Sequence, residues 1–285
     1  MRTASLNVKF LRTAILLILI SLRLPCYPQN IPLPNAFAHN DYWHKHPLRD
    51  ALDNGYTHIE ADIFLRGGKL VVAHFFPFFK KNRTLEKLYL EPLFEQVQKN
   101  GQVFDGYNTP ITLMIDIKSG AESTYKALKA VLEKYRPMLS SYENGHVRYG
   151  LVTIVLSGHK PYQMVKSENS RLVFIDEDLR KIGRDSSLMD VYPMASCKYT
   201  SILNWKGKGV LPAVEKDRLC KLINTAHSMG KKVRLWASPE NKVVWEELLN
   251  CGVDLINTDQ LVTLKNFLNT SFANSKLAER KQLSR

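Results

Sequence analysis

The sequence of 285 residues lacks several features that mark other classes of protein. The apolar run at residues 14–22 is too short to span a bilayer. No run of Lys and Arg is interleaved with aromatic residues, which disfavours nucleic-acid binding. Beyond residue 26 the chain has only Cys197, Cys220 and Cys251, without the spacing of metal ligands. This odd number argues against a disulfide framework and leaves room for one pair.

The N-terminus has the pattern of a secretory signal peptide. Arg2, Lys9 and Arg12 precede the apolar run, and Cys26 follows it. Loss of residues 1–26 removes four basic and no acidic residues, which lowers the net charge from +13 to +9. We therefore expect a secreted or periplasmic protein. An uncleaved anchor and a lipid attached to Cys26 are the alternatives.

After residue 34, short apolar segments alternate with helical segments. Eight apolar segments are rich in Ile, Leu and Val, as expected for strands covered on both faces. They are residues 35–40, 57–65, 112–118, 151–158, 171–178, 192–197, 232–239 and 255–259. Helices are expected at residues 47–55, 84–101, 122–136, 162–169, 217–230 and 241–252. A further strand at 69–74 follows the second strand through the turn RGGK, so we expect a hairpin there.

Eight strands alternating with helices over about 235 residues predict an α/β protein with a single (β/α)8 TIM barrel and an extra hairpin strand near its mouth. A doubly wound open sheet is the alternative, but no glycine-rich phosphate loop follows the first strand. Polar residues gather toward the C-terminal ends of the expected strands, where barrel enzymes place their active sites. They are His39, Glu60, Asp62, Asp116, Lys118, Ser157, Trp236 and Asn257. Because no repeat or linker interrupts the chain, we expect one domain at 30–270 and a basic tail at 271–285.

Glu60 and Asp62 project from the same face of the second expected strand, since side chains alternate along a strand. Asp116 ends the neighbouring strand, so the three carboxylates should meet at one rim. Close carboxylates repel each other and lose hydration, which a cation offsets. Three oxygen ligands favour one divalent cation, Mg2+ or Ca2+, over zinc. The alternative is that Lys118 and backbone donors satisfy these carboxylates without a metal.

His39 ends the first expected strand, and His74 ends the hairpin strand. Because imidazole exchanges protons near neutral pH, two histidines beside a cation suit cleavage of a P–O bond. One would take a proton from the nucleophile, and the other would protonate the leaving oxygen. Lys118 and the metal would hold the charge of the phosphate. A single histidine at a strand end is more often a structural hydrogen-bonding residue, but a pair around acidic residues favours catalysis.

Residues 38–74 resemble the opening of the glycerophosphodiester phosphodiesterase and PI-specific phospholipase C superfamily. The shared pattern is a strand-end His, a helix with AL..G, then I-E-x-D, then a hairpin ending in V-x-H. LMIDIKS, residues 113–119, is similar to the acidic-x-Lys motif of that superfamily's third strand. LWASPE and LLNCGVDLINTD, within residues 235–259, are similar to its ending. The resemblance extends from about residue 35 to 268 and implies a barrel.

The resemblance also implies roles for individual residues. Glu60, Asp62 and Asp116 match the acidic residues that hold a divalent cation in the superfamily. His39 and His74 match its general acid and base. Many members cleave by attack of a neighbouring substrate hydroxyl on phosphorus, which can leave a cyclic phosphate.

Some positions depart from the superfamily pattern. His39-Asn40-Asp41 stands where His-Arg-Gly is usual, so an arginine that would grip phosphate is missing. Asp116, with Lys118 two residues later, is similar to the sphingomyelinase D branch. The whole chain most resembles a secreted group between the branches, which includes the yeast "altered inheritance of mitochondria" type. The resemblance therefore leaves the substrate open.

Two aromatic features bear on the substrate. Residues 74–81, HFFPFFKK, are either packed under the mouth or form an apolar lip that meets acyl chains or a membrane surface. Trp236 either stacks on a cationic head group such as choline or packs in the barrel mouth. Asn257, at the end of the last strand, is expected to face the same substrate.

The sequence thus predicts an exported, metal-dependent and monomeric phosphodiesterase. Its substrate would be a small phosphodiester or a lysophospholipid, with transient contact to a membrane surface. The residues expected to touch the substrate, besides His39 and His74, are Asn40, Lys118, Trp236 and Asn257. One rival is a non-catalytic barrel that binds phospho-head-groups or sugars, which the altered His-Asn-Asp motif favours. The other is a carbohydrate-active hydrolase with Glu60 and Asp116 as its acid pair, which needs no metal.

Overall fold

The computed structural model describes residues 30–75, 82–184 and 190–271. The chain separates into two units, residues 1–30 and 31–285, and the elements below all belong to the second. The expected signal peptide, residues 76–81 of the phenylalanine-rich segment and the tail beyond residue 271 lie outside the described residues. Within the described ranges, no helix has the length and apolar character needed to cross a membrane.

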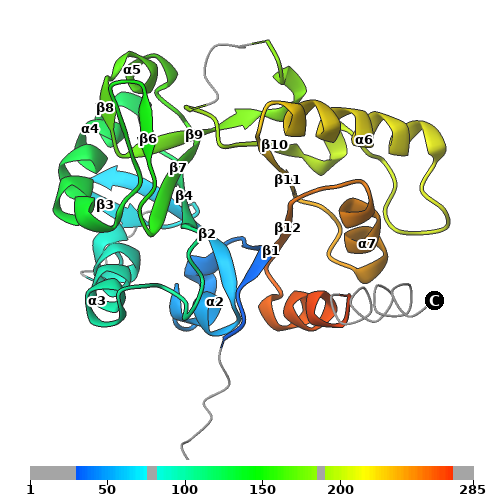
Figure 1. The fold of residues 1–285 in the computed structure, drawn as a ribbon, viewed down its shortest axis with the longest axis horizontal. Coiled ribbons are helices and arrows are strands. Elements are labelled where there is room, and N and C mark those ends of the chain that lie inside the picture. The colour runs from blue at the N-terminus through cyan, green and yellow to red at the C-terminus, as the bar shows by residue number, and fades with distance from the viewer. Residues whose placement is uncertain (1–29, 76–81, 185–189, 272–285) are drawn as a thin grey trace, which may run out of the picture. The chain divides into compact units, whose positions relative to one another are not determined.

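Eight parallel strands close into a barrel (Figure 1). They are β1 (Leu33–Ala38), β2 (Tyr56–Arg66), β4 (Ile111–Ile117), β7 (Val152–Gly158), β9 (Val173–Asp178), β10 (Met194–Lys198), β11 (Lys232–Trp236) and β12 (Leu255–Thr258). Neighbours around the barrel follow the order β1-β12-β11-β10-β9-β7-β4-β2, and β1 also pairs with β2. This last pairing closes the sheet. The predicted barrel is confirmed, and the open-sheet alternative is wrong.

Helices connect the strands on the outside, as predicted. They are α2 (Arg49–Asp53), α3 (Glu91–Asn100), α4 (Ala121–Leu132), α5 (Tyr162–Ser167), α6 (Ala213–Ser228) and α7 (Lys242–Asn250). A helix over 261–271, which we did not predict, follows β12. Two of the helix ends follow the usual rules. The N-cap of α7 is Asn241, whose side chain accepts a hydrogen bond from the backbone N–H of Val244. Gly101, in the left-handed conformation, ends α3.

Short helical turns complete several of the connections. They are η1 (Asp41–Trp43), η2 (Glu86–Leu90), η3 (Glu133–Met138), η4 (Leu179–Lys181) and η5 (Tyr199–Ser201). Of these, η1 follows β1, η4 follows β9 and η5 follows β10, so all three lie at the C-terminal ends of barrel strands. They therefore border the end of the barrel where a (β/α)8 protein builds its site.

Two additions accompany the barrel. β3 (Lys69–Val72) pairs antiparallel with β2, which confirms the predicted hairpin. A small antiparallel sheet, unpredicted, contains β5 (Ser141–Glu143), β6 (His146–Arg148) and β8 (Ser170–Arg171). These three strands precede β7 and β9 in the chain, so they lie toward the N-terminal end of the barrel.

The interior of the barrel is apolar below and polar above. Six buried apolar side chains form a cluster to which Val147 of β6 adds. They are Phe37, Met114, Val155, Phe174, Met194 and Leu255. Two residues further along the same strands, and so on the same face, come His39, Asp116, Ser157, Asp176, Ser196 and Asn257. Strand alternation therefore stacks a polar layer on an apolar floor.

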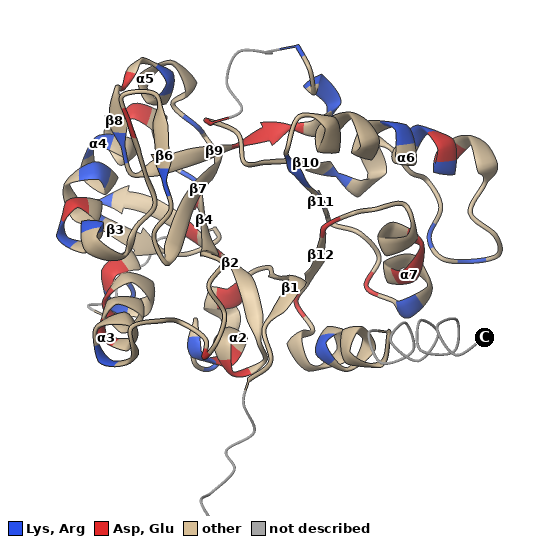
Figure 2. Cartoon of the chain, in the orientation of Figure 1, with Lys and Arg blue, Asp and Glu red and all other residues tan. Residues whose placement is uncertain are grey.

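Charged residues occur on the barrel strands as well as on the outer helices. Figure 2 shows acidic residues in β9 and basic residues in β11. One disulfide joins Cys220 of α6 to Cys251 at the end of α7, and Cys197 is a free, buried thiol. The single pair that the sequence left open is thus formed by the two cysteines of the outer layer.

A buried ion pair supports the outer side of the barrel wall. Lys231 pairs with Glu177 of β9, and their side chains are only 1% and 8% exposed. The Lys231 ammonium also lies 5.0 Å from the centroid of the Tyr192 ring. Since a buried charge is costly without its partner, this pair constrains the packing between β9 and the chain that enters β11.

Lys231→Met should lower the free energy of unfolding by about 3–5 kcal/mol, because Glu177 stays buried without its partner. The double variant Lys231→Met/Glu177→Leu should recover much of that loss. Urea unfolding followed by circular dichroism measures both. As a control, Lys134→Ala removes the exposed pair with Glu86 and should lose less than about 1 kcal/mol. A loss in Lys231→Met as small as in the control would contradict this role.

Asp41 holds the loop that follows β1. Its side chain is fully buried, and its Oδ2 accepts a 2.6 Å hydrogen bond from the backbone N–H of Leu48. Leu48 has a φ of 66°, a conformation that a leucine adopts only where the surroundings impose it. Burial raises the pKa of Asp41 to about 6, although the bond from Leu48 opposes the shift.

Because this pKa is higher in the folded state than its usual 3.8, the folded state binds the proton more tightly. The contribution of Asp41 to stability is therefore fully present below pH 4 and falls as the pH rises to about 6, by about 3 kcal/mol. Asp41→Asn should flatten this part of the stability profile, measured by urea unfolding between pH 4 and 7. Asp53→Asn, at the exposed end of α2, is the matched control. The same slope in Asp41→Asn as in the wild type would refute the assignment.

Candidate functional site

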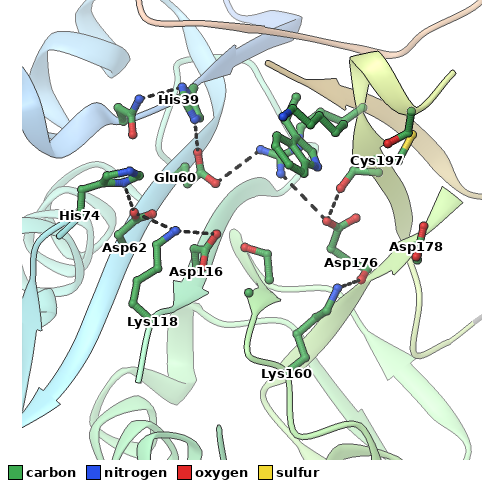
Figure 3. A pocket seen from close by; sticks show the side chains of 18 of the residues that line it. His39, Glu60, Asp62, His74, Asp116, Lys118, Lys160, Asp176, Asp178 and Cys197 are labelled. Atoms are coloured by element: carbon green, nitrogen blue, oxygen red, sulfur yellow. Dashed lines mark hydrogen bonds and ion pairs between the residues drawn. The ribbon is translucent and has the colours of Figure 1, made fainter. Parts of the chain in front are cut away.

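A cavity of about 640 Å³ opens at the C-terminal ends of the barrel strands. In Figure 3, Glu60, Asp62 and Asp116 lie on one side of it, and Asp176, Asp178 and Cys197 lie on the other. The lining residues are His39, Asn40, Glu60, Asp62, His74, Asp116, Lys118, Ser157, Gly158, Lys160, Tyr162, Asp176, Asp178, Arg180, Ser196, Cys197, Lys198, Ser201, Arg234 and Trp236. The set joins both predicted histidines to all three predicted acidic residues.

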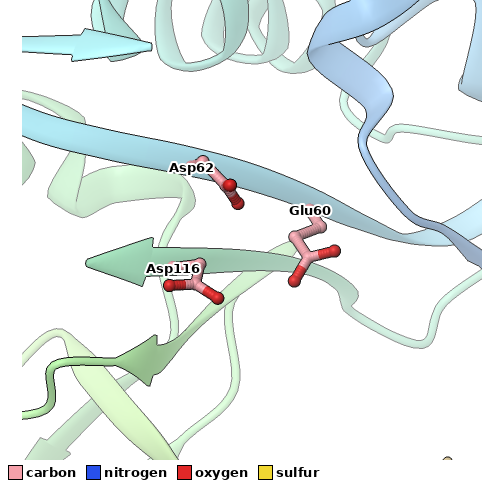
Figure 4. A group of neighbouring side chains, drawn as sticks. All are labelled: Glu60, Asp62 and Asp116. Atoms are coloured by element: carbon pink, nitrogen blue, oxygen red, sulfur yellow. The ribbon is translucent and has the colours of Figure 1, made fainter. Parts of the chain in front are cut away.

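The three carboxylates form one cluster (Figure 4). Glu60 and Asp62 come from β2, and Asp116 comes from the neighbouring β4, where it is in register with Asp62. One oxygen of each carboxylate lies within 4.8 Å of the others. The strand alternation inferred from the sequence is the cause of this geometry, since residues 60 and 62 share the inner face.

Basic groups offset part of this negative charge. The Nζ atom of Lys118 lies 3.1 Å from Oδ2 of Asp62 and 3.2 Å from Oδ2 of Asp116. A guanidinium nitrogen of Arg234 lies 3.6 Å from Oε1 of Glu60. Asp62 and Asp116 thus each contact Lys118 through their Oδ2 atom. Their Oδ1 atoms stay available for another partner.

The basic groups do not fully offset the burial and mutual repulsion of the carboxylates, so the pKa values of Asp62 and Asp116 are raised. Burial raises the pKa of Asp62 to about 6, with further contributions from the charges of Glu60 and Asp116. Burial also raises the pKa of Asp116, although the ammonium of Lys118 opposes it. A divalent cation at this position would favour the ionised forms of all three groups.

The cluster fits a hard divalent cation. Oε2 of Glu60 and Oδ1 of Asp116 are buried, and neither has a hydrogen-bond partner among the described residues. Gly158, with a φ of 67°, leaves room beside this site, because a Cβ there would lie 2.1 Å from Oδ1 of Asp116. Carboxylate oxygens are the ligands that Mg2+ and Ca2+ take in proteins. The donor set contains no thiolate, so it does not resemble a structural zinc site.

His39 is oriented by the end of the barrel's last strand. Its Nδ1 lies 2.7 Å from Oδ1 of Asp259, and its Nε2 lies 3.7 Å from Oε2 of Glu60. Burial alone would lower the pKa of His39, but the Asp259 hydrogen bond and the charge of Glu60 raise it overall. Asn40 donates to the same Asp259 oxygen at 3.2 Å, and its φ of 49° is one that asparagine tolerates well. Its side-chain amide therefore also serves to hold Asp259.

His74 is oriented by the carboxylate cluster itself. Its Nδ1 lies 2.7 Å from Oδ2 of Asp62, and the Tyr42 hydroxyl lies 2.9 Å from that same oxygen. Burial and the charge of Asp62 raise the pKa of Tyr42, so this hydroxyl stays protonated. The rings of Trp43 and Phe75 make edge contacts with His74, and both are exposed. An aromatic rim thus adjoins this histidine.

Arg234 connects the two sides of the cavity, because its guanidinium lies 3.6 Å from Glu60 Oε1 and 4.0 Å from Asp176 Oδ2. Arg234 of β11 is buried, and it is held by Asn257 Oδ1 at 3.3 Å and Asp176 Oδ2 at 4.0 Å. The Ser196 hydroxyl donates to Oδ2 of Asp176. The Nε atom of Arg234 has no hydrogen-bond partner among the described residues. This guanidinium is therefore fixed in place and retains a donor.

All but one of the residues predicted to meet the substrate line the cavity. His39, Asn40, His74, Lys118 and Trp236 line the cavity with the three acidic residues. Asn257 is buried, does not line the cavity, and instead orients Arg234. The side chain predicted to meet substrate thus acts on a neighbour that does line the cavity.

Sequence reasoning missed several residues of the site. They are Tyr42, Lys160, Asp176, Lys198, Arg234 and Asp259. A signal was present for three of them, because Asp176, Lys198 and Arg234 are inward positions of apolar strands, like Glu60 and Asp62. The signal for Tyr42 and Asp259 was weak, since Tyr42 lies in the short turn η1 and Asp259 lies directly after β12.

Comparisons with known proteins show which family the sequence resembles. The model of the AIM6-like phosphodiesterase domain family matches residues 29–176, just over half of the chain. The chain is 28% identical over 273 residues to Altered inheritance of mitochondria protein 6 of Eremothecium gossypii, covering 82% of this chain and 69% of that protein. For the same protein of Lachancea thermotolerans the identity is 27%, covering 80% of this chain and 64% of the relative.

A solved structure of a glycerophosphodiester phosphodiesterase from Parabacteroides distasonis has a TM-score of 0.49 and 11% sequence identity to this chain. It covers 85% of this chain, and 98% of its own length is covered. The family match extends over β1 to β9 and therefore includes His39, His74 and the three carboxylates. The resemblance drawn from the sequence motifs is confirmed, and the chain belongs to the family of AIM6-like phosphodiesterase domains.

Proposed function

We propose that the chain is an exported, metal-dependent phosphodiesterase that cleaves glycerophosphodiesters or lysophospholipid head groups. One observation carries the proposal. His39 and His74 face a single cavity, each held through Nδ1 by a carboxylate, and the three-carboxylate cluster lies in the same cavity. A histidine fixed in this way keeps Nε2 for proton transfer.

The two histidines would divide the proton transfers of P–O cleavage. One accepts a proton from the attacking hydroxyl as its oxygen bonds to phosphorus. The other gives a proton to the leaving oxygen, which keeps the electron pair of the broken P–O bond. Asp259 stabilises the protonated form of His39, and Asp62 with Tyr42 orients His74. Paired groups of this kind typically contribute factors of about 100 to 10,000 each to the rate.

Three basic or metal groups would hold the phosphate. Lys118 and Arg234 both line the cavity and lie against the carboxylate cluster. The first loop has Asn40 in place of the superfamily's usual arginine. Arg234 of β11 supplies a guanidinium to the same cavity instead. A divalent cation held by Glu60, Asp62 and Asp116 would neutralise charge on the phosphate oxygens.

Export is part of the proposal. The expected signal peptide lies outside the described residues, and the Cys220–Cys251 disulfide supports an oxidising destination, where such bonds persist. N-terminal sequencing of the protein released by cells that express the whole chain tests this. A chain that stays in the cytoplasm with residues 1–26 attached would contradict export.

His39→Ala should lower turnover at least about 100-fold while leaving the fold intact, because the residue lies on the rim and supports little core. 31P NMR with glycerophosphocholine and lysophosphatidylcholine measures turnover, and its new resonance separates a cyclic phosphate from an open monoester. His146→Ala, on the exposed strand β6, is the matched control and should keep full activity. Unfolding of His39→Ala, or its full activity, would count against the catalytic role.

Mg2+ or Ca2+ at 100 times its dissociation constant should raise the free energy of unfolding by about 3 kcal/mol in the wild type. Glu60→Gln should lose most of this gain, whereas Glu122→Gln, exposed on α4, should keep it. Thermal unfolding with and without each cation measures the effect, and chelation should abolish the 31P signal of product.

The outcomes separate the rival functions. Equal cation effects in Glu60→Gln and the wild type would mean that the cluster does not bind the cation, as expected if Lys118 and other donors satisfy its carboxylates. Cation binding without turnover of any diester would favour a binding barrel. Sugar hydrolysis that survives chelation would favour the carbohydrate-active alternative.

A further inference from the structure

The cavity wall opposite the carboxylate cluster carries basic residues. In the barrel order, β10 lies four strands from β2 in either direction, so the two strands face each other across the barrel. Lys198 is the last residue of β10, Lys160 follows β7, and Arg180 follows β9. All three line the cavity. Strand order thus places Lys198 away from Glu60 and Asp62. Lys160 follows β7, which is next to β4, and its ammonium reaches β9 through the hydrogen bond to the backbone carbonyl of Asp176.

Two of these cations form no ion pair within the described part of the chain, although Lys160 is near enough to Asp176 to oppose the rise in the pKa of that carboxyl group. Arg180 is paired with Asp178 at 2.7 Å. Lys160, in contrast, donates only to the backbone carbonyl of Asp176, at 2.6 Å, and lies over the ring of Tyr162. Among the described residues, the Lys198 ammonium contacts only the ring of Trp236, 5.9 Å from its centroid. Both lysines therefore offer N–H donors and positive charge to the cavity.

With a divalent cation at the carboxylate cluster, the remaining charges of the cavity would balance. Lys118 and a divalent cation would match the three clustered carboxylates, and Arg234 is close to the carboxylate of Asp176. A phosphodiester carries one negative charge, which is fewer than the two that Lys160 and Lys198 would balance. A substrate that fills the cavity with matched charge needs a second anionic group.

Lys198 also decides what Trp236 can bind. The indole is 38% exposed, but the Lys198 ammonium already occupies a position over its ring. A quaternary ammonium that stacked on this face would meet a like charge. The choline-type contact that the sequence left open for Trp236 is therefore disfavoured by its neighbour in register on β10.

We propose that Lys160 and Lys198 form a subsite for a second anionic group of the substrate, a carboxylate or a phosphate, and that the chain prefers diesters with such head groups over choline. The inference rests on the proposed function, because it names the substrate class of that same site. The phosphodiester would lie at the carboxylate cluster, and the second anion would lie across the cavity. Charge-assisted hydrogen bonds from the two ammonium groups would hold it.

Glycerophosphoserine and glycerophosphoethanolamine test the subsite directly, because they differ only by one carboxylate. Wild-type kcat/KM with Mg2+ should be roughly tenfold higher for the serine compound, as expected for one charge-assisted hydrogen bond. Calorimetric dissociation constants for the same pair should show the same order. The binding measurement stands without turnover, so it separates failure of this inference from failure of the proposed function.

Lys198→Gln and Lys160→Gln should each reduce the preference for glycerophosphoserine, and the double variant should remove it. Lys198→Gln should also raise relative turnover of glycerophosphocholine, because the Trp236 ring is then uncovered. Lys126→Gln, exposed on α4, is the control and should keep the wild-type preference. Circular dichroism checks that each variant is folded.

Each result has a distinct meaning. Equal or weaker binding of glycerophosphoserine in the wild type overturns the anion subsite, even if all diesters are cleaved. An unchanged preference in the folded double variant overturns the assignment to these lysines. Absence of turnover for every diester, with preferential binding of the serine compound, overturns the proposed function and leaves the subsite intact.

Discussion

The repulsion among three closely spaced carboxylates, two of them buried, is the constraint that the other residues of the cavity offset. Glu60, Asp62 and Asp116 meet because two adjacent parallel strands are in register and their inner faces coincide. Lys118 and Arg234 offset only part of the charge. Asp62 also orients His74, so the carboxylates that would bind a cation also fix the position of one histidine. Removing any of these acids would therefore alter several contacts at once.

The fold was largely predictable because its strands are short, apolar and separated by helices with clear stop signals. The acidic trio was predictable for a related reason: a charged residue at an inward position of an apolar strand is costly, and so it stands out. The two histidines followed from their places at strand ends. Closure of the barrel needed only the count and order of elements, since sequential parallel strands pair with their neighbours.

Other features depend on contacts between separate elements, which sequence patterns do not encode. Arg234 lies in an apolar strand as Glu60 does, but its partners come from three other strands, β2, β9 and β12. Tyr42 contributes through a loop whose path is set by buried Asp41. The strands β5, β6 and β8 have two or three residues each, too few for a periodic signal. The sequence predicted the correct end of the strand for Asn257. Its neighbour Arg234, however, lines the cavity in its place.

The apolar floor of the barrel has a consequence for how ligands enter and leave the cavity. Phe37, Met114 and four other side chains fill the interior beneath the polar layer, and Val147 of the small sheet packs against them from the N-terminal side. A molecule that reaches the carboxylates by way of the mouth thus meets a dead end. Ligands would enter and leave through the same opening, so a departing fragment bound near the rim would delay the next arrival. Release of one ligand through the mouth would then have to precede binding of the next, because no second route leads through the barrel floor.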